Sequence, residues 1–158
     1  MLIAVASDHA GYRYKQHVRE LLAKWGHEVL DFGTDSEAPV DYPEFIRPAA
    51  LAVSRGLADR AIIFGGSGNG EAMVANRIAG VRCAVSWSVE SARLSREHND
   101  ANVLSIGERL VPSAELEAIV RTWLETGFHG GRHARRIALI DQPFSRRDTA
   151  SPEERGQG

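Results

Sequence analysis

Short apolar runs alternate with longer segments in which apolar residues recur at helical spacing. Residues 2–6, 28–32, 61–64, 81–87 and 103–106 have the length and composition of short strands. Helices are expected between and after them, over residues 12–25, 42–55, 72–78, 88–97, 112–125 and 132–140. Strands that alternate with helices in this way predict an α/β domain with a parallel sheet.

Two residues bear on helix ends. Ser88 is a good N-cap residue for the helix after the fourth strand. Pro48 lies deep in the segment 42–55, and we expect it to kink this helix or to delay its start. From Gln142 on, Pro, Ser, Arg and Glu dominate, so we divide the chain into a domain over residues 1–141 and a mobile C-terminal tail over residues 142–158.

The composition is that of an ordinary globular protein. The chain has 158 residues, of which 43% are hydrophobic and 25% are charged, which argues against a disordered or fibrous protein. Its 19 Lys and Arg against 21 Asp and Glu give a net charge of −2, whereas a nucleic-acid scaffold would be basic, so no nucleic-acid partner is expected.

A single cysteine, Cys83, excludes a disulfide within the chain and a cysteine-based zinc cluster. It lies in an apolar segment, where we expect a buried, inert thiol. The sequence shows neither a signal-peptide core nor an apolar stretch long enough to cross a bilayer. We therefore expect a cytoplasmic protein without a membrane partner.

The segment 65–71, Gly-Gly-Ser-Gly-Asn-Gly-Glu, follows a predicted strand and precedes a predicted helix. Glycines let the backbone approach a ligand, and amides at a helix N-terminus bind anions or a developing oxyanion. The segment is neither a Walker loop nor a G-x-G-x-x-G motif. A tight turn would explain the glycines alone, but the three polar residues favour a binding site. Glu71 is either a general base or a surface carboxylate favoured by the helix dipole.

Three further groups can be interpreted in two ways. The pair Asp8–His9 ends the first strand, and Asp8 can equally cap the next helix. The segment 98–100, His-Asn-Asp, follows the fourth helix and is typical of a helix end. Arg132 and Arg136 share one helix face, where they can bind a phosphate or form a solvated basic surface. Neither histidine segment has the spacing of metal ligands.

Six segments in this order resemble a known family. They are residues 7–12 (Ser-Asp-His-Ala-Gly-Tyr), 41–43 (Asp-Tyr-Pro), 65–71, 75–77 (Ala-Asn-Arg), 96–102 (Arg-Glu-His-Asn-Asp-Ala-Asn) and 132–136 (Arg-His-Ala-Arg-Arg). Together they resemble ribose-5-phosphate isomerase type B, in the family that also contains galactose-6-phosphate isomerase. The match extends from Met1 to about Asp141 and leaves out the tail.

The resemblance implies a Rossmann-like three-layer sandwich with a five-stranded parallel sheet. It also implies an aldose–ketose isomerase that interconverts ribose 5-phosphate and ribulose 5-phosphate through an enediolate, in the pentose phosphate pathway. The family uses no cofactor and no metal. It forms homodimers or tetramers whose active sites are shared between subunits, so His98 and Asn99 are expected to come from the neighbour.

The resemblance also assigns roles to individual residues. In many members a cysteine at the position of Gly65 is the base, whereas this chain resembles the branch with a glutamate after the loop. The implied catalytic residues are Glu71, Ser67, His98 and Asp8. The implied substrate-binding residues are His9, Gly66, Gly68, Asn69, Gly70, Asn99, Arg109, Arg132 and Arg136.

Two alternatives remain. The first is an isomerase of another sugar phosphate, a tetrose or hexose phosphate. The second is a non-catalytic sugar-phosphate-binding module, which would keep the glycine loop and the arginines but would not need Glu71, His98 and Asp8 together.

Overall fold

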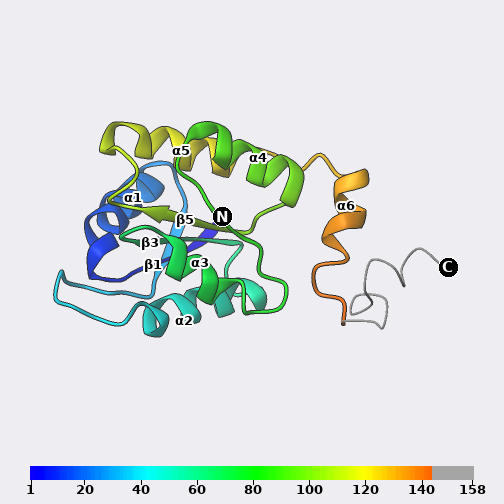
Figure 1. Cartoon of the computed structure of the whole chain (residues 1–158). Coiled ribbons are helices and arrows are strands. Elements are labelled where there is room, and N and C mark those ends of the chain that lie inside the picture. The colour runs from blue at the N-terminus through cyan, green and yellow to red at the C-terminus, as the bar shows by residue number, and fades with distance from the viewer. Residues whose placement is uncertain (144–158) are drawn as a thin grey trace.

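Five parallel strands form the centre of the computed structural model, which describes residues 1–143 (Figure 1). Their order across the sheet is β2-β1-β3-β5-β4, and every neighbouring pair is parallel. The predicted Rossmann-like α/β sandwich is confirmed. The strands are β1 (Leu2–Ser7), β2 (Glu28–Asp31), β3 (Arg60–Gly65), β4 (Cys83–Val85) and β5 (Val103–Gly107).

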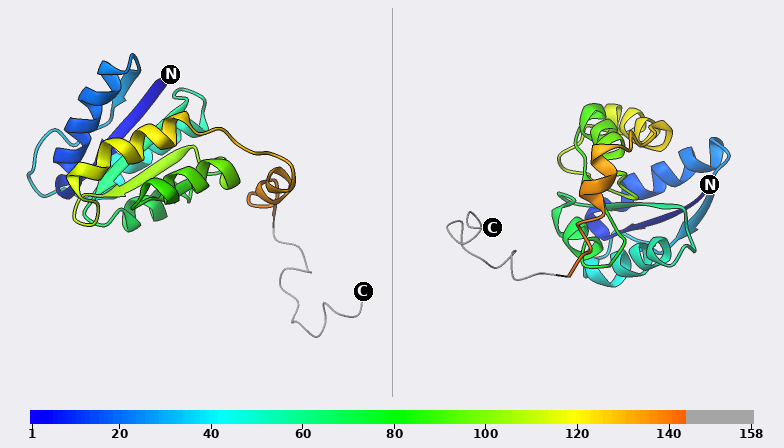
Figure 2. Two further views of the ribbon diagram at one scale, coloured as in Figure 1. Left: turned by 90° about the horizontal axis from the view of Figure 1, so that it is seen from above. Right: turned by 90° about the vertical axis from the view of Figure 1, so that its right-hand side faces the viewer.

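The two faces of the sheet carry different helices because successive side chains of a strand point to opposite sides. Ile3 and Val5 of β1 belong to the larger core, which also includes residues of α1, α4 and α5. Ala4 and Ala6 face the other way, toward α2 and α3, in a core rich in alanine. These helices form the two outer layers in Figures 1 and 2; they are α1 (Tyr12–Lys24), α2 (Tyr42–Ser54), α3 (Asn69–Ala75), α4 (Val89–Asn99) and α5 (Ser113–Glu125).

The helix ends differ from the predicted ones where side chains or loop geometry decide them. Ser88 caps α4 as predicted, because its hydroxyl accepts a hydrogen bond from the Ser91 amide at 3.1 Å. This helix continues two residues beyond its predicted end, so His98 and Asn99 form its last turn instead of following it. Pro48 lies inside α2 and does not delay its start, since the helix already begins at Tyr42.

Strand β4 is much shorter than the predicted strand over residues 81–87. Only Cys83–Val85 form it, at the edge of the sheet beside β5. On its other side, the Asn76 side chain donates a hydrogen bond to the Cys83 carbonyl oxygen at 2.9 Å and accepts one from the Cys83 amide at 2.8 Å. A single side-chain amide therefore pairs with the outer edge of this strand.

A short last helix, α6 (Arg132–Ile137), extends away from the sandwich and is near α4 (Figures 1 and 2). None of its residues is buried. The predicted tail over residues 142–158 lies, from residue 144 on, outside the described residues. Within residues 1–143, none of the helices has the length and apolar character that crossing a membrane requires.

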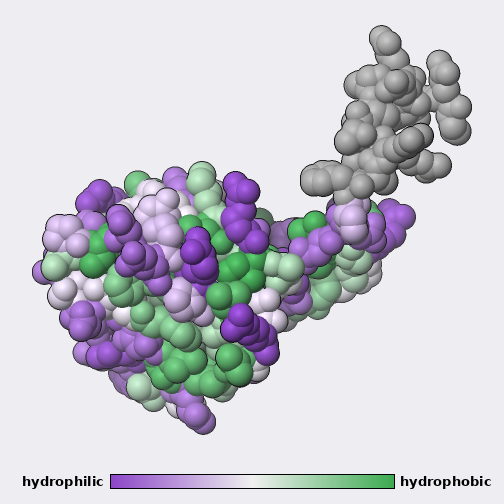
Figure 3. Space-filling model, turned by 90° about the horizontal axis from the view of Figure 1, so that it is seen from below, coloured by the Kyte–Doolittle hydropathy of each residue, from purple (hydrophilic) through white to green (hydrophobic). Residues whose placement is uncertain are grey.

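The side of the molecule that carries α2 and α3 exposes both hydrophobic and hydrophilic residues (Figure 3). Met73 of α3 is 67% exposed, and Leu57, shortly after α2, is 61% exposed. Apolar side chains are also exposed near β4 and at the end of α6, where Trp87, Leu139 and Ile140 are each more than half exposed.

Candidate active site

A cavity of about 440 Å³ lies where β1 and β3 end and where the chain leaves β5. Ligands of parallel sheets usually bind at these carboxyl ends of the strands. The cavity brings together seven of the residues predicted for the site and adds three others. Its lining consists of Asp8, His9, Ala10, Tyr42, Gly66, Ser67, Gly70, Glu71, Arg109 and Leu110.

The glycine loop at the end of β3 is fixed by hydrogen bonds to its neighbours. Gly68 has a φ of +80°, which favours glycine, and its carbonyl oxygen accepts a hydrogen bond from the Ser105 hydroxyl at 2.7 Å. The Gly66 carbonyl oxygen accepts one from the Arg109 amide at 3.0 Å. The loop and Arg109 are therefore held together by the main chain. Gly68 and Asn69 belong to the loop but do not line the cavity.

Glu71 lies in the first turn of α3, and only 4% of its surface is exposed. Its carboxyl group occupies the space beside Gly65, where an added Cβ atom would lie 2.0 Å from Glu71 Oε1. Any side chain at position 65 would displace this carboxyl group. The Glu71 carboxylate thus fills the space in which the resemblance places a cysteine in other members.

The surroundings of Glu71 raise the pKa of its carboxyl group. Burial is the main cause, and the negative charge of Asp8 adds to it, while a hydrogen bond from Glu71's own backbone amide acts in the opposite direction. A general base works best when its pKa approaches the working pH. The raised pKa therefore favours the interpretation of Glu71 as a base over that of a surface carboxylate.

Asp8 and His9 begin the turn that follows β1. Asp8 Oδ1 accepts hydrogen bonds from the amides of Ala10 and Gly11, at 2.9 and 3.0 Å, so the side chain caps this turn while lining the cavity. His9 Nδ1 accepts a hydrogen bond from the Val40 amide at 3.2 Å. Because Nδ1 is the acceptor, a neutral His9 carries its proton on Nε2 and can donate it to a ligand.

Tyr42 lines the cavity, although the sequence reasoning assigned it no role. Its ring lies against Gly70, where an added Cβ atom would be 2.9 Å from Tyr42 Cζ. Tyr42 belongs to the segment Asp-Tyr-Pro at 41–43, one of the six segments that resemble the family, and this could have indicated a role in the site. On its own, however, an aromatic residue before a proline indicates only a helix start.

The other four predicted residues do not line this cavity. His98 and Asn99 lie in the last turn of α4, and Arg132 and Arg136 lie on α6. Helix α4 runs back from the carboxyl end of β4 to the amino end of β5. Its last turn therefore lies at the amino ends of the strands, whereas the glycine loop lies at their carboxyl ends. The predicted site residues thus form two groups within one chain.

Three histidine rings pack against one another beside the arginines of the second group. His98 stacks on His133 of α6, with ring centroids 4.5 Å apart, and meets His129 edge to face at 6.2 Å. The pKa of His133 is lowered, first by the partial loss of water around its ring and then by the neighbouring charges of His98, Arg132 and Arg136. The group is therefore a cationic surface, as an anion site requires.

Cys83 is half-buried at the sheet edge, and its thiol is not activated. Burial raises its pKa, and the negative charge of Glu71 raises it further. A thiol needs the thiolate form to react, so these surroundings agree with the expected inert side chain.

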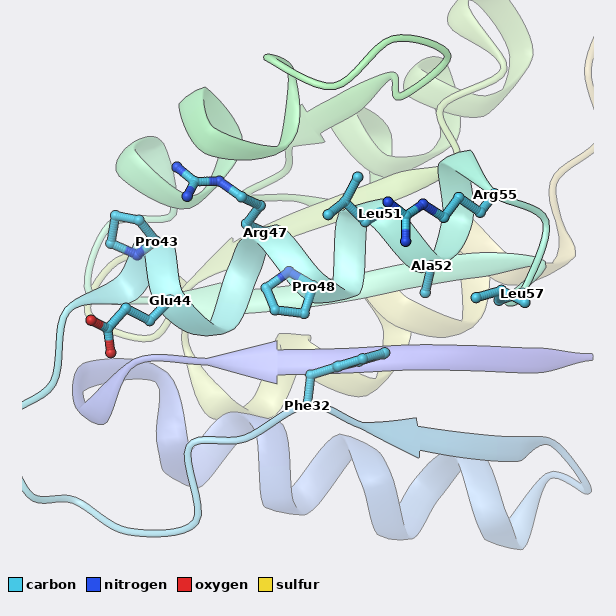
Figure 4. Close-up of a pocket in the computed structure, with 9 residues that line it drawn as sticks. All are labelled: Phe32, Pro43, Glu44, Arg47, Pro48, Leu51, Ala52, Arg55 and Leu57. Atoms are coloured by element: carbon cyan, nitrogen blue, oxygen red, sulfur yellow. The ribbon is translucent and has the colours of Figure 1, made fainter.

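A separate groove of about 430 Å³ runs along α2 next to Phe32 (Figure 4). Arg47, Arg55 and Glu44 contribute charge to a lining that is otherwise apolar. None of the residues predicted for the site belongs to it, so we assign the chemistry to the cavity at the glycine loop.

Comparison with known proteins agrees with this geometry. Residues 3–140 match the family described as Ribose/Galactose Isomerase. The chain belongs to this family. The match extends from β1 past α6, so it includes both groups of predicted site residues.

Relatives and solved structures point to one branch of the family. Ribose-5-phosphate isomerase B of Mycobacterium tuberculosis is 41% identical over 154 residues, which cover 96% of this chain and 94% of that protein. The structure of ribose-5-phosphate isomerase B from Clostridium thermocellum has a TM-score of 0.88 and 47% identity, and covers 89% of this chain and 95% of that one. The Mycoplasma genitalium enzyme, solved with bound ribulose 5-phosphate, has a TM-score of 0.85 and 38% identity, covering 88% and 93%.

Proposed function

We propose that the protein is an aldose–ketose isomerase that interconverts ribose 5-phosphate and ribulose 5-phosphate. The observation that carries this proposal is the buried Glu71 carboxylate beside the glycine loop, in a family whose relatives are named for this reaction. The family likeness alone would also fit a module that only binds sugar phosphates. A carboxylate with a raised pKa at this position is what proton transfer needs.

The proposed reaction moves one proton between two carbons. Glu71 removes the proton from C2 of the open-chain aldose, and negative charge develops on the oxygen at C1. Backbone amides of the loop 66–70, with the N-terminus of α3 behind them, stabilise this enediolate oxygen. Glu71 then returns the proton to C1 while the hydroxyl proton at O2 passes to O1, which gives the ketose. Ser67 bonds a sugar oxygen.

Substrate binding uses cationic residues away from the reacting carbons. Arg109 lines the cavity close to Gly66, and His9 offers its Nε2 proton to the phosphate. Arg132 and Arg136, one turn apart on α6, can hold the same phosphate bidentately. Binding energy from the phosphate orients the sugar and lowers the barrier at the distant carbons.

The active site requires a second copy of the chain, because one chain keeps its two groups of site residues apart. We propose a homodimer, or a tetramer built from two such dimers, with an isologous interface. In it, His98, Asn99, Arg132 and Arg136 of one copy complete the cavity of the other, and His98 and Asp8 open the furanose ring. The exposed apolar side chains of Met73, Trp87 and Ile140 are available to form this interface.

An isomerase assay with tetrose, pentose and hexose phosphates side by side tests the function. We expect ribose 5-phosphate to have the highest kcat/KM and its product to be ribulose 5-phosphate. A higher kcat/KM for a tetrose or hexose phosphate would move the protein to the first alternative. Binding of all three sugar phosphates without turnover would support the second alternative, a non-catalytic sugar-phosphate-binding module. We place the enzyme in the cytoplasm, where phosphorylated sugars are retained by their charge.

A further inference from the structure

Three possible metal ligands converge at the end of α4. Glu97 and His98 come from its last turn, and His129 comes from the segment between α5 and α6. One carboxylate oxygen and one nitrogen of each imidazole all lie within 4.8 Å of one another. The His129 amide donates a hydrogen bond to the Glu97 carbonyl oxygen at 3.0 Å, so the main chain fixes this approach.

The atoms that would bind an ion are available. Glu97 Oε2 accepts a hydrogen bond from Arg93, but Oε1 faces His129 Nε2 at 3.7 Å. His98 uses the face of its ring to stack on His133, which leaves its nitrogens in the ring plane. Within residues 1–143, no hydrogen bond occupies a ring nitrogen of His98 or His129.

We propose that Glu97, His98 and His129 form a reversible, inhibitory site for a transition-metal ion of the Zn²⁺ class. Two imidazoles and one carboxylate are a common set of three zinc ligands, with the fourth position open to water. Zinc bonds of about 2.1 Å place ligand atoms about 3.4 Å apart. The ligand atoms here lie within 4.8 Å of one another, and the exposed His129 side chain can move inward to close the difference. Mg²⁺ and Ca²⁺ prefer oxygen ligands and are not expected to bind.

The charges around the cluster make the site reversible. Glu97 supplies one negative charge, whereas Arg93 on the same helix and Arg132 and Arg136 on α6 are positive. These cations weaken the binding of a divalent ion. The inhibitory part of the proposal rests on the proposed function, because an ion bound to His98 would withdraw this imidazole from ring opening.

Direct binding tests the site without relying on activity. Calorimetric titration of the purified oligomer with Zn²⁺ is expected to show one ion bound per chain. His129→Gln removes a ligand at a residue that has no proposed role in catalysis or substrate binding, and should weaken Zn²⁺ binding roughly tenfold or more. His17→Gln, which removes an exposed histidine of α1, should bind as the wild type does. Equal Zn²⁺ affinity in His129→Gln and the wild type would overturn the site.

The isomerase assay tests the inhibition. Zn²⁺ should inhibit the wild type and His17→Gln, with recovery after EDTA, whereas Mg²⁺ should not. His129→Gln should keep its basal kcat and lose the inhibition. If His129→Gln is inhibited like the wild type, the inhibitory link is wrong. If the wild type isomerises none of the sugar phosphates, the proposed function fails, and the calorimetric titration still decides whether the metal site exists.

Discussion

The glycine-loop cavity and the second group of predicted site residues, on α4 and α6, are positioned in different ways. The second group consists of His98, Asn99, Arg132 and Arg136. The cavity lies at the ends of β1 and β3, and hydrogen bonds from the Arg109 amide to Gly66 and from the Ser105 hydroxyl to Gly68 fix its loop. The position of the second group's arginines depends on α6, a helix with no buried residue. The proposed base, Glu71, thus lies in the packed part of the domain. Two of the proposed phosphate-binding residues, Arg132 and Arg136, lie on the exposed helix α6. In the proposed dimer, the surface of the other copy would position this helix.

Removing the base is expected to have the largest effect. Glu71→Gln should lower kcat by roughly two orders of magnitude or more, with KM little changed, since general-base catalysis is lost. The matched control is Glu44→Gln, which changes an exposed glutamate in the first turn of α2. Steady-state kinetics with ribose 5-phosphate measure both variants. Near-normal turnover of Glu71→Gln would mean that another group moves the proton.

Complementation tests whether the two regions come from different chains. Glu71→Gln and His98→Ala, each inactive alone, are mixed and refolded together. A hybrid dimer would contain one site with both changes and one with neither. Activity should recover to about a quarter of the wild-type value, because half of randomly paired dimers are hybrids with one intact site. Hybrids without activity would show that each site belongs to one chain.

Loss of Arg132 or Arg136 from α6 should affect the phosphorylated substrate much more than the unphosphorylated sugar. Arg132→Ala or Arg136→Ala should raise KM for ribose 5-phosphate roughly ten- to a hundredfold, since a charge-assisted hydrogen bond contributes about 1.5–3 kcal/mol. Binding of unphosphorylated ribose should change little. Arg135→Ala, on the same helix but off the shared face, is the control. Equal losses for both ligands would indicate a structural role for these arginines.

The raised pKa of Glu71 also predicts how stability depends on pH. A carboxyl group whose pKa is higher in the folded state contributes stability below its unfolded pKa, and this contribution is lost as pH rises through the folded pKa. Glu71→Gln should therefore raise Tm by a few degrees at pH 8, and the gain should disappear toward pH 4. Calorimetry at both pH values measures this. An equal gain at the two pH values would assign it to packing instead of charge.

Cys83 should give the smallest effect. Cys83→Ser should keep kcat and KM within roughly twofold of the wild type, because burial and the Glu71 charge keep the thiol protonated. Thiol reagents should not inactivate the enzyme through this residue. A large loss of kcat in Cys83→Ser, with an unchanged Tm, would give the thiol a role in the chemistry.

The sequence predicted the sheet and its helices because their signals are local. Apolar runs identified the five strands, and Ser88 marked the start of α4. The start of α3 was predicted three residues late, at Ala72, because Asn69 and Gly70 are weak helix formers. The length of β4 follows its pairing with β5, which covers only Cys83–Val85, and no local pattern reveals this tertiary contact.

The candidate site likewise has parts that local sequence signals predict and parts that depend on the path of the chain. The glycine loop and Glu71 are adjacent in the chain, so their proximity could be read from the sequence. That His98 lies apart from Glu71 follows from the direction of α4, and the stacking of His98 on His133 follows from the path of the chain after α5. The carboxyl group of Glu71 beside Gly65 became visible only in three dimensions.

The hydrogen bonds between Asn76 and Cys83 have a consequence for aggregation. An edge strand with free amides and carbonyls is a template on which another chain can add a strand. Here Asn76 uses both outward-facing groups of Cys83, so the sheet cannot continue into a neighbouring molecule at that residue. This part of β4 is therefore a poorer template for open-ended β-assemblies than a fully free edge would be.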